Sequence, residues 1–576
     1  MLPKLGVALL SAALLLPATA AAHVPPGTAQ LAADRAVAWF QTQQAQDGNL
    51  GDFGGDWAMI ALANAGVNAA DLHAAPAAAS LQDFYTGTWT STGVGTQSTD
   101  QARALLTGYA GGVRGARLSA TQNVLARQLR YFDGKQLGLP GTVNDDMFGL
   151  IALTRNGVPD LAPALAKEVR RAQTEGGWNY TTTGGPADID MTGAGIATLC
   201  EAGATAADPA VADALKVVKA AQDDATGGFG SDFFGVNADT TAWVVNGLRA
   251  CGIDPQGPEW TTASGKTPLD FLVAMQKDNG AFRWRPSDDA DNLYSTQDAV
   301  TALVGDGFGA DPAPRANASE PTFRPDPVVA DGTVVPMALL IDHGPAEPGA
   351  ERACSVQAPV GGDVAAVLAD TDSALPKGCA TDVQLSGGRL VSVNGVAADA
   401  QHEWVVSVNG GPASARLAQD VALGSVVRAA LVARDGGDPP PPAATPTPAA
   451  PELPPVTPVP AAEPRRARAA LASGNRRLRL RGGRVSLRLS CPRGLGATGC
   501  QGVVRVQYTA GKRTRTAGSA AFKVRSGART TVRVKLNAPF RRLVTHTGRA
   551  VRLVAATRDQ ATRSTTVARL RARVRR

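Results

Sequence analysis

The chain has 576 residues, more than one hydrophobic core can hold, which excludes a single-domain protein. Its net charge of +7 is the balance of two unlike parts. Residues 465–576 contain 30 lysines and arginines and one acidic residue, a charge of +29, whereas the rest of the chain contains 27 basic and 49 acidic residues, a charge of −22. This distribution excludes one common type of partner for the whole chain and predicts separate partners for its acidic and basic parts.

The N-terminal segment, residues 1–22, is predicted to be a secretory signal peptide. Lys4 supplies a positive charge, an apolar run extends from Gly6 to Leu16, and an Ala-Thr-Ala or Ala-Ala-Ala sequence provides a small-residue cleavage site. The apolar run is too short to cross ~30 Å of hydrocarbon, and no other stretch is suited to it. We therefore expect a secreted or cell-surface associated protein.

A degenerate unit recurs six times in residues 27–310. Each unit is an amphipathic helix pattern, then a Gly-rich loop with an aromatic residue, then an acidic or hydroxyl residue that opens a small apolar helix. The units lie about 45–55 residues apart, the period of a helix-pair repeat. Six pairs can close into a ring, so the sequence predicts an (α/α)6 toroid with the second helix of each pair inside. The opening positions are Asp56, Asp100, Asp145–Asp146, Asp188–Asp190, Asp239 and Ser295–Asp298.

Two further domains are predicted after the toroid. Residues 328–435 alternate in the manner of strands bounded by Asn-Gly and Gly-Gly turns, which predicts a small mixed β-domain. Residues 436–464 are rich in Pro, Ala and Thr and are expected to form an extended linker. Residues 470–576 alternate again, with arginine at the polar positions, which predicts an antiparallel β-sandwich with arginine on its solvent face.

The six cysteines fall two to each predicted domain, an arrangement typical of disulfides in an oxidising location. We expect no metal site, because the chain has no Cys-x-x-Cys pair and no histidine near the cysteines. The predicted disulfides are Cys200–Cys251, Cys354–Cys379 and Cys491–Cys500.

The toroid loops resemble the QW repeats of squalene cyclases and protein prenyltransferases. The resemblance covers about half of the chain and concerns the fold more than the chemistry. It implies that the glutamine and the aromatic residue of each loop tie an outer helix to the next loop. The matching residues are Gln173 with Trp178, Gln222 with Phe229, and Gln276 with Phe282.

Residues 392–413, SVNGVAADAQHEWVVSVNGGPA, resemble the small C-terminal β-domain of transcobalamin and intrinsic factor. Those carriers share the order found here, a secretion signal, a helical toroid and a β-domain. The resemblance implies a corrinoid-like ligand in the interface between the toroid and the β-domain, with no cofactor required.

The sequence Asp188-Ile-Asp190-Met191 is similar to the DxDD motif of class II terpene cyclases, whose middle aspartate protonates an alkene. The similarity ends at Met191, which replaces the last acid. Since acidic or hydroxyl residues recur at this place in other units, helix capping, worth ~0.5–2 kcal/mol, explains them better. Contact with a ligand stays open for Asp188, Asp190 and Asp239.

An enzymatic alternative also stays open. Some polysaccharide-cleaving enzymes use an α/α toroid and two carboxylates. Asp190, Asp239 and residues 288–291 are candidates for a common groove. A zinc-dependent prenyltransferase is not expected, because His73 is the single histidine of the toroid.

These observations favour an exported, non-catalytic binding protein that holds a small ligand, such as a corrinoid, between toroid and β-domain. The alternative is a secreted enzyme acting on a glycan or an isoprenoid. The basic domain is expected to bind anionic cell-envelope polymers; nucleic acid is not expected, because aromatic residues for base stacking are few. The aromatic candidates for ligand contact are Tyr180, Phe234, Tyr294 and Trp404.

Overall fold

The computed structural model divides the chain into two compact units, residues 1–445 and 446–576. The predicted signal peptide and linker lie outside the described residues. The described residues are 24–25, 27–51, 54–182, 185–231, 234–305, 307–347, 351–369, 371–434, 470–471, 477–491, 500–510, 513–525, 528–544, 549–558 and 565–575.

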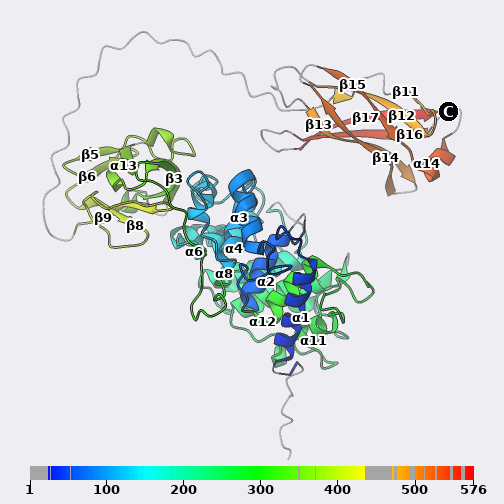
Figure 1. Cartoon of the computed structure of the whole chain (residues 1–576), viewed down its shortest axis with the longest axis horizontal. Helices are drawn as coiled ribbons and strands as arrows, with labels where there is room; N and C mark the ends of the chain where they lie inside the picture. Colours follow the sequence, from blue (N-terminus) through cyan, green and yellow to red (C-terminus); the bar gives the residue numbers. More distant parts are fainter. Residues whose placement is uncertain are drawn as a thin grey trace, which may run out of the picture. The chain divides into compact units, whose positions relative to one another are not determined.

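The first unit begins with helices α1 to α12, coloured from blue to green in Figure 1. We call the second helix of each consecutive pair an inner helix and the first an outer helix. The outer helices are α1 (Thr28–Gln43), α3 (Leu81–Thr92), α5 (Val124–Leu129), α7 (Ala162–Arg171), α9 (Pro209–Ala220) and α11 (Pro268–Ala274). The inner helices are α2 (Ala58–Asn64), α4 (Ser98–Ala110), α6 (Asn144–Arg155), α8 (Ile189–Glu201), α10 (Ala238–Ala250) and α12 (Leu293–Val304).

Small residues let the inner helices approach closely. A Cβ atom on Gly193 of α8 would lie 2.6 Å from the carbonyl oxygen of Trp243 on α10, and one on Gly247 of α10 would lie 2.6 Å from the carbonyl oxygen of Gly193. Each inner helix packs against the next in chain order, and α12 packs against α2. The first turns of the inner helices therefore face one end of the bundle, and their last turns face the other.

The segment after α12 crosses the end at which the inner helices finish. The side chain of Asn64, at the end of α2, donates to the carbonyl oxygen of Gly307 at 3.2 Å. The hydroxyl of Tyr109, at the end of α4, donates to Asp311 at 2.9 Å. This segment therefore lies against the C-terminal ends of these inner helices, opposite the end that carries the acidic first turns.

The glutamines of the QW-like loops bond as the resemblance implies. The amide of Gln173 donates to the carbonyl oxygens of Gly176, in its own loop, and Ala210, at the start of the next outer helix, both at 2.8 Å. Gln222 repeats this arrangement in the next unit. In the last unit the amide of Gln276 donates at 2.7 Å to the carbonyl oxygen of Ala32 on α1, so α11 is tied to the first helix of the bundle.

The β-part of the first unit is built on a mixed four-stranded sheet in the order β4-β3-β9-β8, in which β3 and β9 are parallel. Helix α5 packs against β3 and β4. The predicted Asn-Gly turns are present: Asn394 and Gly395, both with positive φ, join β6 to β7. The strands are β3 (Val334–Asp342), β4 (Glu351–Pro359), β5 (Gln384–Ser386), β6 (Arg389–Val393), β7 (Val396–Ala397), β8 (His402–Val408) and β9 (Val426–Ala433).

The second unit has two open sheets that contribute to one core, in the orders β10-β12-β15 and β11-β17-β16-β13-β14. The prediction of a purely antiparallel arrangement is wrong in one place, because β11 pairs with β17 in parallel. The strands are β10 (Ala470–Leu471), β11 (Arg477–Arg479), β12 (Arg484–Ser490), β13 (Cys500–Ala510), β14 (Arg513–Val524), β15 (Arg529–Lys535), β16 (Arg549–Arg558) and β17 (Thr565–Arg575).

Three disulfides are present, and their pairings confirm the prediction: Cys200–Cys251, Cys354–Cys379 and Cys491–Cys500. Such bonds are typical of extracellular proteins. Among the helices that the structure describes, none has both the length and the hydrophobicity to cross a membrane.

Candidate functional site

Three carboxylates from consecutive inner helices meet near the end of the bundle at which these helices begin. Asp190 lies in the first turn of α8, Asp239 in the first turn of α10, and Asp298 one turn further into α12. The Trp243 indole donates to Asp298 at 3.0 Å, and the Ser295 hydroxyl donates to Asp239. We call Asp190, Asp239 and Asp298 the acid trio.

The pKa values of the acid trio are all raised, but to different extents. Burial raises the pKa of Asp190 to about 6, with the charges of Asp188 and Asp239 adding to the effect, while a hydrogen bond from Thr240 opposes it. Burial also raises the pKa of Asp239 to about 6. The pKa of Asp298 is raised well above its ordinary value, first by burial and then by the charges of Asp239 and Asp190. Asp298 therefore favours its protonated form more strongly than an ordinary carboxyl group does, while Asp190 and Asp239 are mostly ionised at neutral pH.

Aromatic rings lie directly beside the acid trio, and we call Trp57, Phe148, Trp243 and Phe308 the aromatic cluster. Phe308 contacts the other three rings edge-on, with centroids 5.4 Å from Trp243, 5.5 Å from Phe148 and 6.3 Å from Trp57. Phe148 also meets Trp243 at 5.7 Å. Trp57, Phe148 and Trp243 are half-buried, whereas Phe308, from the segment that covers the far end, is buried.

Trp243 connects the acid trio with the aromatic cluster. It follows Asp239 by one helical turn, so both side chains lie on the same face of α10, and its indole donates to Asp298. The carboxyl group of Asp298, with its raised pKa, therefore lies at the edge of the aromatic cluster. A carboxylic acid next to several aromatic faces can deliver a proton to an apolar group and stabilise the cation that results.

A second polar group lies on α2 and α4. Arg103 pairs with the buried Asp56 at 3.2 Å, and the Tyr85 hydroxyl and the Tyr294 ring lie close to the glycines that precede Asp56. Burial raises the pKa of Asp56, and the charge of Arg103 opposes that shift. The guanidinium group balances this carboxylate, so Asp56 is a weaker candidate for a proton donor than Asp298.

Asp146 also has a raised pKa, of about 8, mainly through burial. Its carboxylate accepts a 2.6 Å bond from the backbone N–H of Leu137, and the nearest other acids are Glu168 on α7, Asp145 and Asp133. Apart from Asp145, its neighbour on α6, these partners belong to an outer helix and to the loop before α6. Asp146 therefore holds that loop in place rather than joining the acid trio.

A cavity of about 770 Å³ opens beside the first turn of α8. Asp188 and Asp223 bring negative charge to its wall, Asn179 and Ser231 bring neutral polar groups, and Phe234 adds an aromatic ring. Its described lining contains no lysine or arginine. The cavity suits a neutral or cationic polar group better than an anionic one.

The predicted site residues divide into several groups. Asp188, not Asp190, caps α8, since it accepts a 2.9 Å bond from the N–H of Met191. The prediction that Asp188 or Asp190 caps this helix is therefore confirmed at Asp188. Tyr294 lies near Asp56, whereas Tyr180, 53% exposed, lines none of the cavities described here. Trp404 is a core residue of the β-part, with its indole bonded to the carbonyl oxygen of Val396.

We expected residues 288–291 to face a common groove with Asp190 and Asp239. The acidic side chains of residues 288–291 make local ion pairs instead. Asp288 pairs with Arg285 at 3.2 Å, and Asp291 pairs with Lys277 at 2.7 Å. Both are local surface ion pairs. Among the described residues, no group of three or more His, Cys, Asp or Glu side chains is arranged to hold a metal ion.

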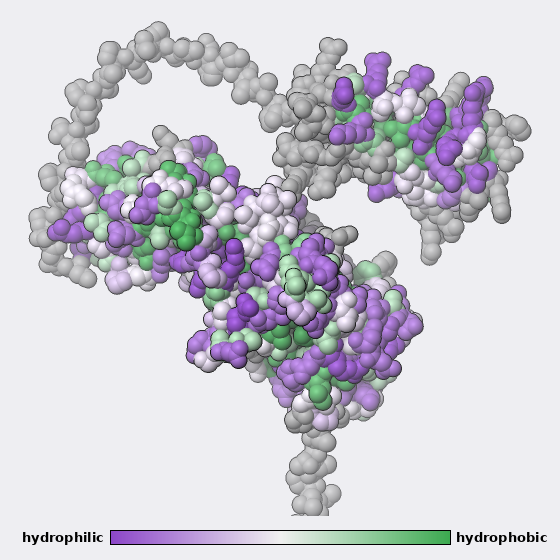
Figure 2. Space-filling model, viewed as in Figure 1, coloured by the Kyte–Doolittle hydropathy of each residue, from purple (hydrophilic) through white to green (hydrophobic). Residues whose placement is uncertain are grey.

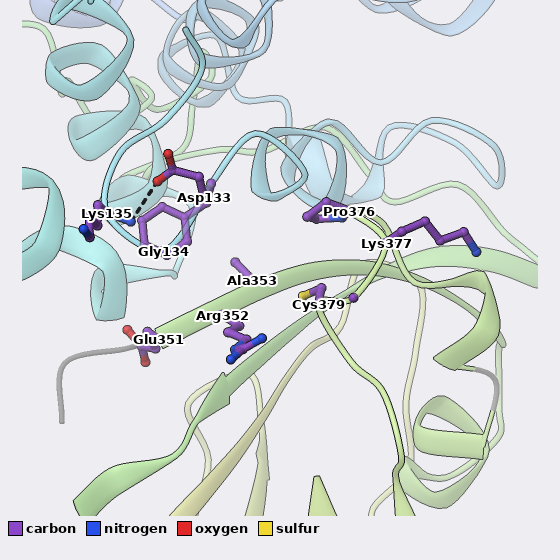
Figure 3. Close-up of a pocket in the computed structure, with 11 residues that line it drawn as sticks. Asp133, Gly134, Lys135, Glu351, Arg352, Ala353, Pro376, Lys377 and Cys379 are labelled. Carbon is purple, nitrogen blue, oxygen red and sulfur yellow. Dashed lines mark hydrogen bonds between the residues drawn. The ribbon is translucent and has the colours of Figure 1, made fainter. Parts of the chain in front are cut away.

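The interface between the helices and the β-part, where the carrier hypothesis placed its ligand, is closed by direct contacts. Arg428 pairs with Asp160 at 3.2 Å, and the amide of Asn123 donates to the carbonyl oxygen of Pro336 at 2.9 Å. A cavity of about 410 Å³ remains between residues 132–135 and strand β4; in Figure 3 the loop with Asp133 and Lys135 faces Glu351 and Arg352.

A second interface cavity, about 220 Å³, lies near the last turns of α4 and α6. Its volume is below the range of about 300–1,000 Å³ that is usual for ligand pockets. None of the predicted ligand-contact residues lines either interface cavity. The arrangement therefore differs from the one that the carrier hypothesis requires.

Sequence reasoning missed the acid trio as a unit. The three aspartates are far apart in the chain, and only the packing of α8, α10 and α12 brings them together. One signal was available: Asp239 with Trp243, and Tyr294 with Asp298, have the four-residue spacing that places side chains on one helix face. Because α10 and α12 are separated by more than 40 residues of sequence, this spacing alone did not indicate that Asp239 and Asp298 belong to one site.

No protein family matches the sequence, and no curated protein is similar to it. Solved structures do resemble the helical part. The type II terpene cyclase MstE from Scytonema matches with a TM-score of 0.36 and 14% identity, over 48% of this chain and 97% of MstE. The ent-copalyl diphosphate synthase from Streptomyces platensis matches with a TM-score of 0.31 and 18% identity, over 44% of this chain and 50% of that enzyme.

MstE variants were also solved with the substrate geranylgeranyl dihydroxybenzoate (TM-score 0.35, 14% identity, over 48% of this chain and 97% of the variant) and with the product merosterolic acid A (TM-score 0.36, 13% identity, over 48% and 96%). The helical half of the chain thus resembles the terpene cyclase fold, and at these identities the likeness concerns the fold alone. The matched proteins are enzymes, which contradicts our prediction of a non-catalytic binding protein and our expectation that the chain is more likely not an enzyme. The enzymatic alternative agrees better with these matches.

Proposed function

We propose that the helices of the first unit form a closed (α/α)6 toroid and that its interior catalyses an acid-initiated reaction of an isoprenoid. The observation that carries the proposal is the position of Asp298, which bonds to Trp243 at the edge of the aromatic cluster and whose pKa is raised well above its ordinary value by burial. An isoprenoid offers alkenes, which accept a proton only when the resulting cation is stabilised. Aromatic faces provide that stabilisation without acting as nucleophiles.

The chemical step balances within the substrate and one carboxyl group. The Asp298 O–H bond breaks, and its proton forms a C–H bond with one alkene carbon, using the π pair of that alkene. The neighbouring carbon becomes cationic, and a second alkene closes a ring by donating its own π pair. Loss of a proton from an adjacent carbon to a basic oxygen restores an alkene, so the net reaction is an isomerisation. Asp190 and Asp239, mostly ionised at neutral pH, stabilise the positive charge electrostatically.

The cavity beside α8 is the proposed location of the polar end of the substrate. Asp188 lines this cavity and interacts electrostatically with Asp190, so the cavity lies beside the acid trio. Because its described lining is acidic or neutral, we propose a substrate with a hydroxylated head rather than a diphosphate. The apolar chain would then extend toward Trp243 and Phe148.

A glycan remains the second candidate substrate. Glycoside hydrolysis also needs one protonated and one ionised carboxyl group, which Asp298 and Asp239 would provide. The rings packed beside Asp298 favour the isoprenoid, since they replace the polar groups that would bind sugar hydroxyls.

The setting of the enzyme also belongs to this proposal. We propose that residues 1–22 direct export, that residues 27–310, 328–435 and 470–576 are separate domains, and that the last of these is a β-sandwich. The three disulfides support export, because they persist in oxidising compartments.

Product formation tests the proposal. The purified full-length protein is incubated with geranylgeraniol, farnesol or squalene, and extracts are analysed by gas chromatography and mass spectrometry for isomers of the substrate. We expect cyclic isomers from wild type, and a loss of at least ~100-fold in rate for Asp298→Asn. Asp213→Asn, which alters an exposed ion pair with Lys216, is the matched control and should retain full activity. Cleavage of a polysaccharide panel without any isoprenoid product would favour the glycan.

A further inference from the structure

The second unit carries a cationic surface on strands β12 and β15. Along β12, Val485, Leu487 and Leu489 are buried, whereas the alternate residues point outward. Strand β15 pairs with β12 antiparallel and shows a similar alternation. We call the outward side of this pair the cationic face. Its residues are Arg484, Ser486, Arg488 and Ser490 on β12, and Arg529, Thr531, Arg533 and Lys535 on β15.

The register sets arginines opposite hydroxyl residues. Ser486 lies opposite Arg533, Arg488 opposite Thr531, and Ser490 opposite Arg529. Directly opposite residues in an antiparallel pair have Cα atoms about 4.5–5.5 Å apart, so each guanidinium group and its hydroxyl can bind the same oxyanion. The fourth outward pair, Arg484 and Lys535, has two like charges. The face thus repeats one donor arrangement three times along the strands.

The region that contains this face is strongly basic. Residues 465–576 contain a single acidic residue, Asp559, which lies outside the described residues. Like charges at opposite positions of a strand pair oppose folding. A bound polyanion would remove this repulsion, so the domain gains stability from such a partner.

The donor chemistry indicates phosphate. Of the 30 cationic residues in this region, 27 are arginine, whose planar guanidinium group binds phosphate oxygens in pairs. Arginine and hydroxyl side chains together are the common phosphate contacts of proteins that bind phosphodiester backbones. At about 3.3 Å per residue, Arg484 and Arg488 lie ~13 Å apart, so the face spans several phosphates rather than one ion.

The aromatic residues distinguish between phosphate polymers. Binding of single-stranded nucleic acid usually adds stacking of bases on exposed aromatic rings. In the second unit Tyr508, Phe522 and Phe540 are buried in the core, and the first and last of these pack together with ring centroids 4.7 Å apart. The described part of the cationic face therefore provides backbone contacts without a stacking surface. On the side seen in Figure 2, hydrophilic side chains extend from this unit with hydrophobic ones between them.

We propose that the cationic face binds a linear phosphodiester polymer that has no stacking bases. The bound phosphates lie along β12 and β15, each between a guanidinium group and a hydroxyl. The polymer would hold the protein at a phosphate-rich surface. This proposal is independent of the chemistry of the first unit.

Binding of the full-length protein to poly(glycerol phosphate), measured by fluorescence anisotropy, tests this proposal. The face variant replaces the five cations of the cationic face, and the matched control replaces five exposed cations of the other sheet, so both lose the same charge. The face variant is R484Q/R488Q/R529Q/R533Q/K535Q, and the control is R479Q/R505Q/K523Q/R573Q/R575Q. A third variant, S486A/S490A/T531A, keeps every charge and remains informative if the face variant does not fold.

We expect the face variant to weaken binding by at least ~30-fold at low salt and the control by less than ~5-fold. With about five phosphates bound, the affinity of wild type should fall ~100-fold between 0.05 and 0.2 M salt. The hydroxyl variant should weaken binding by about tenfold with an unchanged salt dependence. Equal weakening by the face and control variants would contradict the proposal, because binding would then depend on the total positive charge of the unit and not on this face. Tighter binding of oligo-dT with the same number of phosphates would assign the face to nucleic acid, and equal binding of hyaluronate would remove the preference for phosphate.

Discussion

At the scale of single residues, the structure separates two tasks that the sequence assigned to one motif. Asp188 caps α8, and Asp190, two residues later, faces Asp239 on the neighbouring helix. The carboxyl group next to Trp243 comes from Asp298, in a different repeat. The motif Asp188-Ile-Asp190 therefore marks the first turn of one inner helix, and the site needs three such turns.

The ionisation of Asp190 should be visible as a pH-dependent stability. Its pKa is about 6 in the folded protein, against about 3.9 in an unfolded chain, so the folded state binds more protons between these values. Stability from this group is complete below about pH 4 and is lost as the pH rises through 6. Asn cannot ionise, so the free energy of unfolding of Asp190→Asn relative to wild type should increase by about 2 kcal/mol between pH 4.5 and 7. Thermal melts of both proteins check this, and a constant difference would contradict it.

The cap at Asp188 gives a separate prediction. Asp188→Ala should lower the free energy of unfolding by about 1 kcal/mol, whereas Asp188→Asn, which still accepts the Met191 N–H, should be nearly neutral. Chemical denaturation of the two variants measures the difference. Equal destabilisation by both would mean that the charge, and not the cap, is what the helix requires.

At the scale of elements, the sequence predicted what depends on local chemistry. The helix pairs follow from amphipathic periodicity, the Asn394–Gly395 turn from the need for positive φ, and the three disulfides from the distribution of the cysteines, two to each domain. What escaped prediction depends on contacts between distant segments. The parallel pairing of β11 with β17 joins strands at opposite ends of the unit, and neither alternation nor turn residues specify it.

The tie between the last and first repeats gives a prediction at this scale. The bond from Gln276 to Ala32 on α1 joins the ends of the bundle, and Gln173 and Gln222 make the corresponding bonds between consecutive repeats. If the bundle is closed, Gln276→Ala should lower the free energy of unfolding as much as Gln222→Ala does, by about 1–2 kcal/mol. Denaturant titration compares them. A silent Gln276→Ala would indicate an open superhelix.

At the scale of the whole molecule, the two units are expected to act independently. They are separate compact bodies, and the described disulfides stay within their own units. Truncation after Thr445 should leave the melting temperature of the first unit and its turnover unchanged, while binding to poly(glycerol phosphate) disappears. Calorimetry measures the melting temperature, analysis of cyclic products measures the turnover, and fluorescence anisotropy measures the binding. A lower melting temperature of the truncated protein would show that the units stabilise each other.

The central claim is that Asp298 gives its proton to a carbon atom of an isoprenoid, and isotope incorporation tests it most directly. In D₂O the acid trio exchanges with solvent, so wild type acting on geranylgeraniol should form a cyclic isomer that carries deuterium on carbon. Asp298→Asn should form none while its circular dichroism spectrum and melting temperature remain close to those of wild type. Cyclic product without deuterium, or undiminished turnover by Asp298→Asn, would contradict the account.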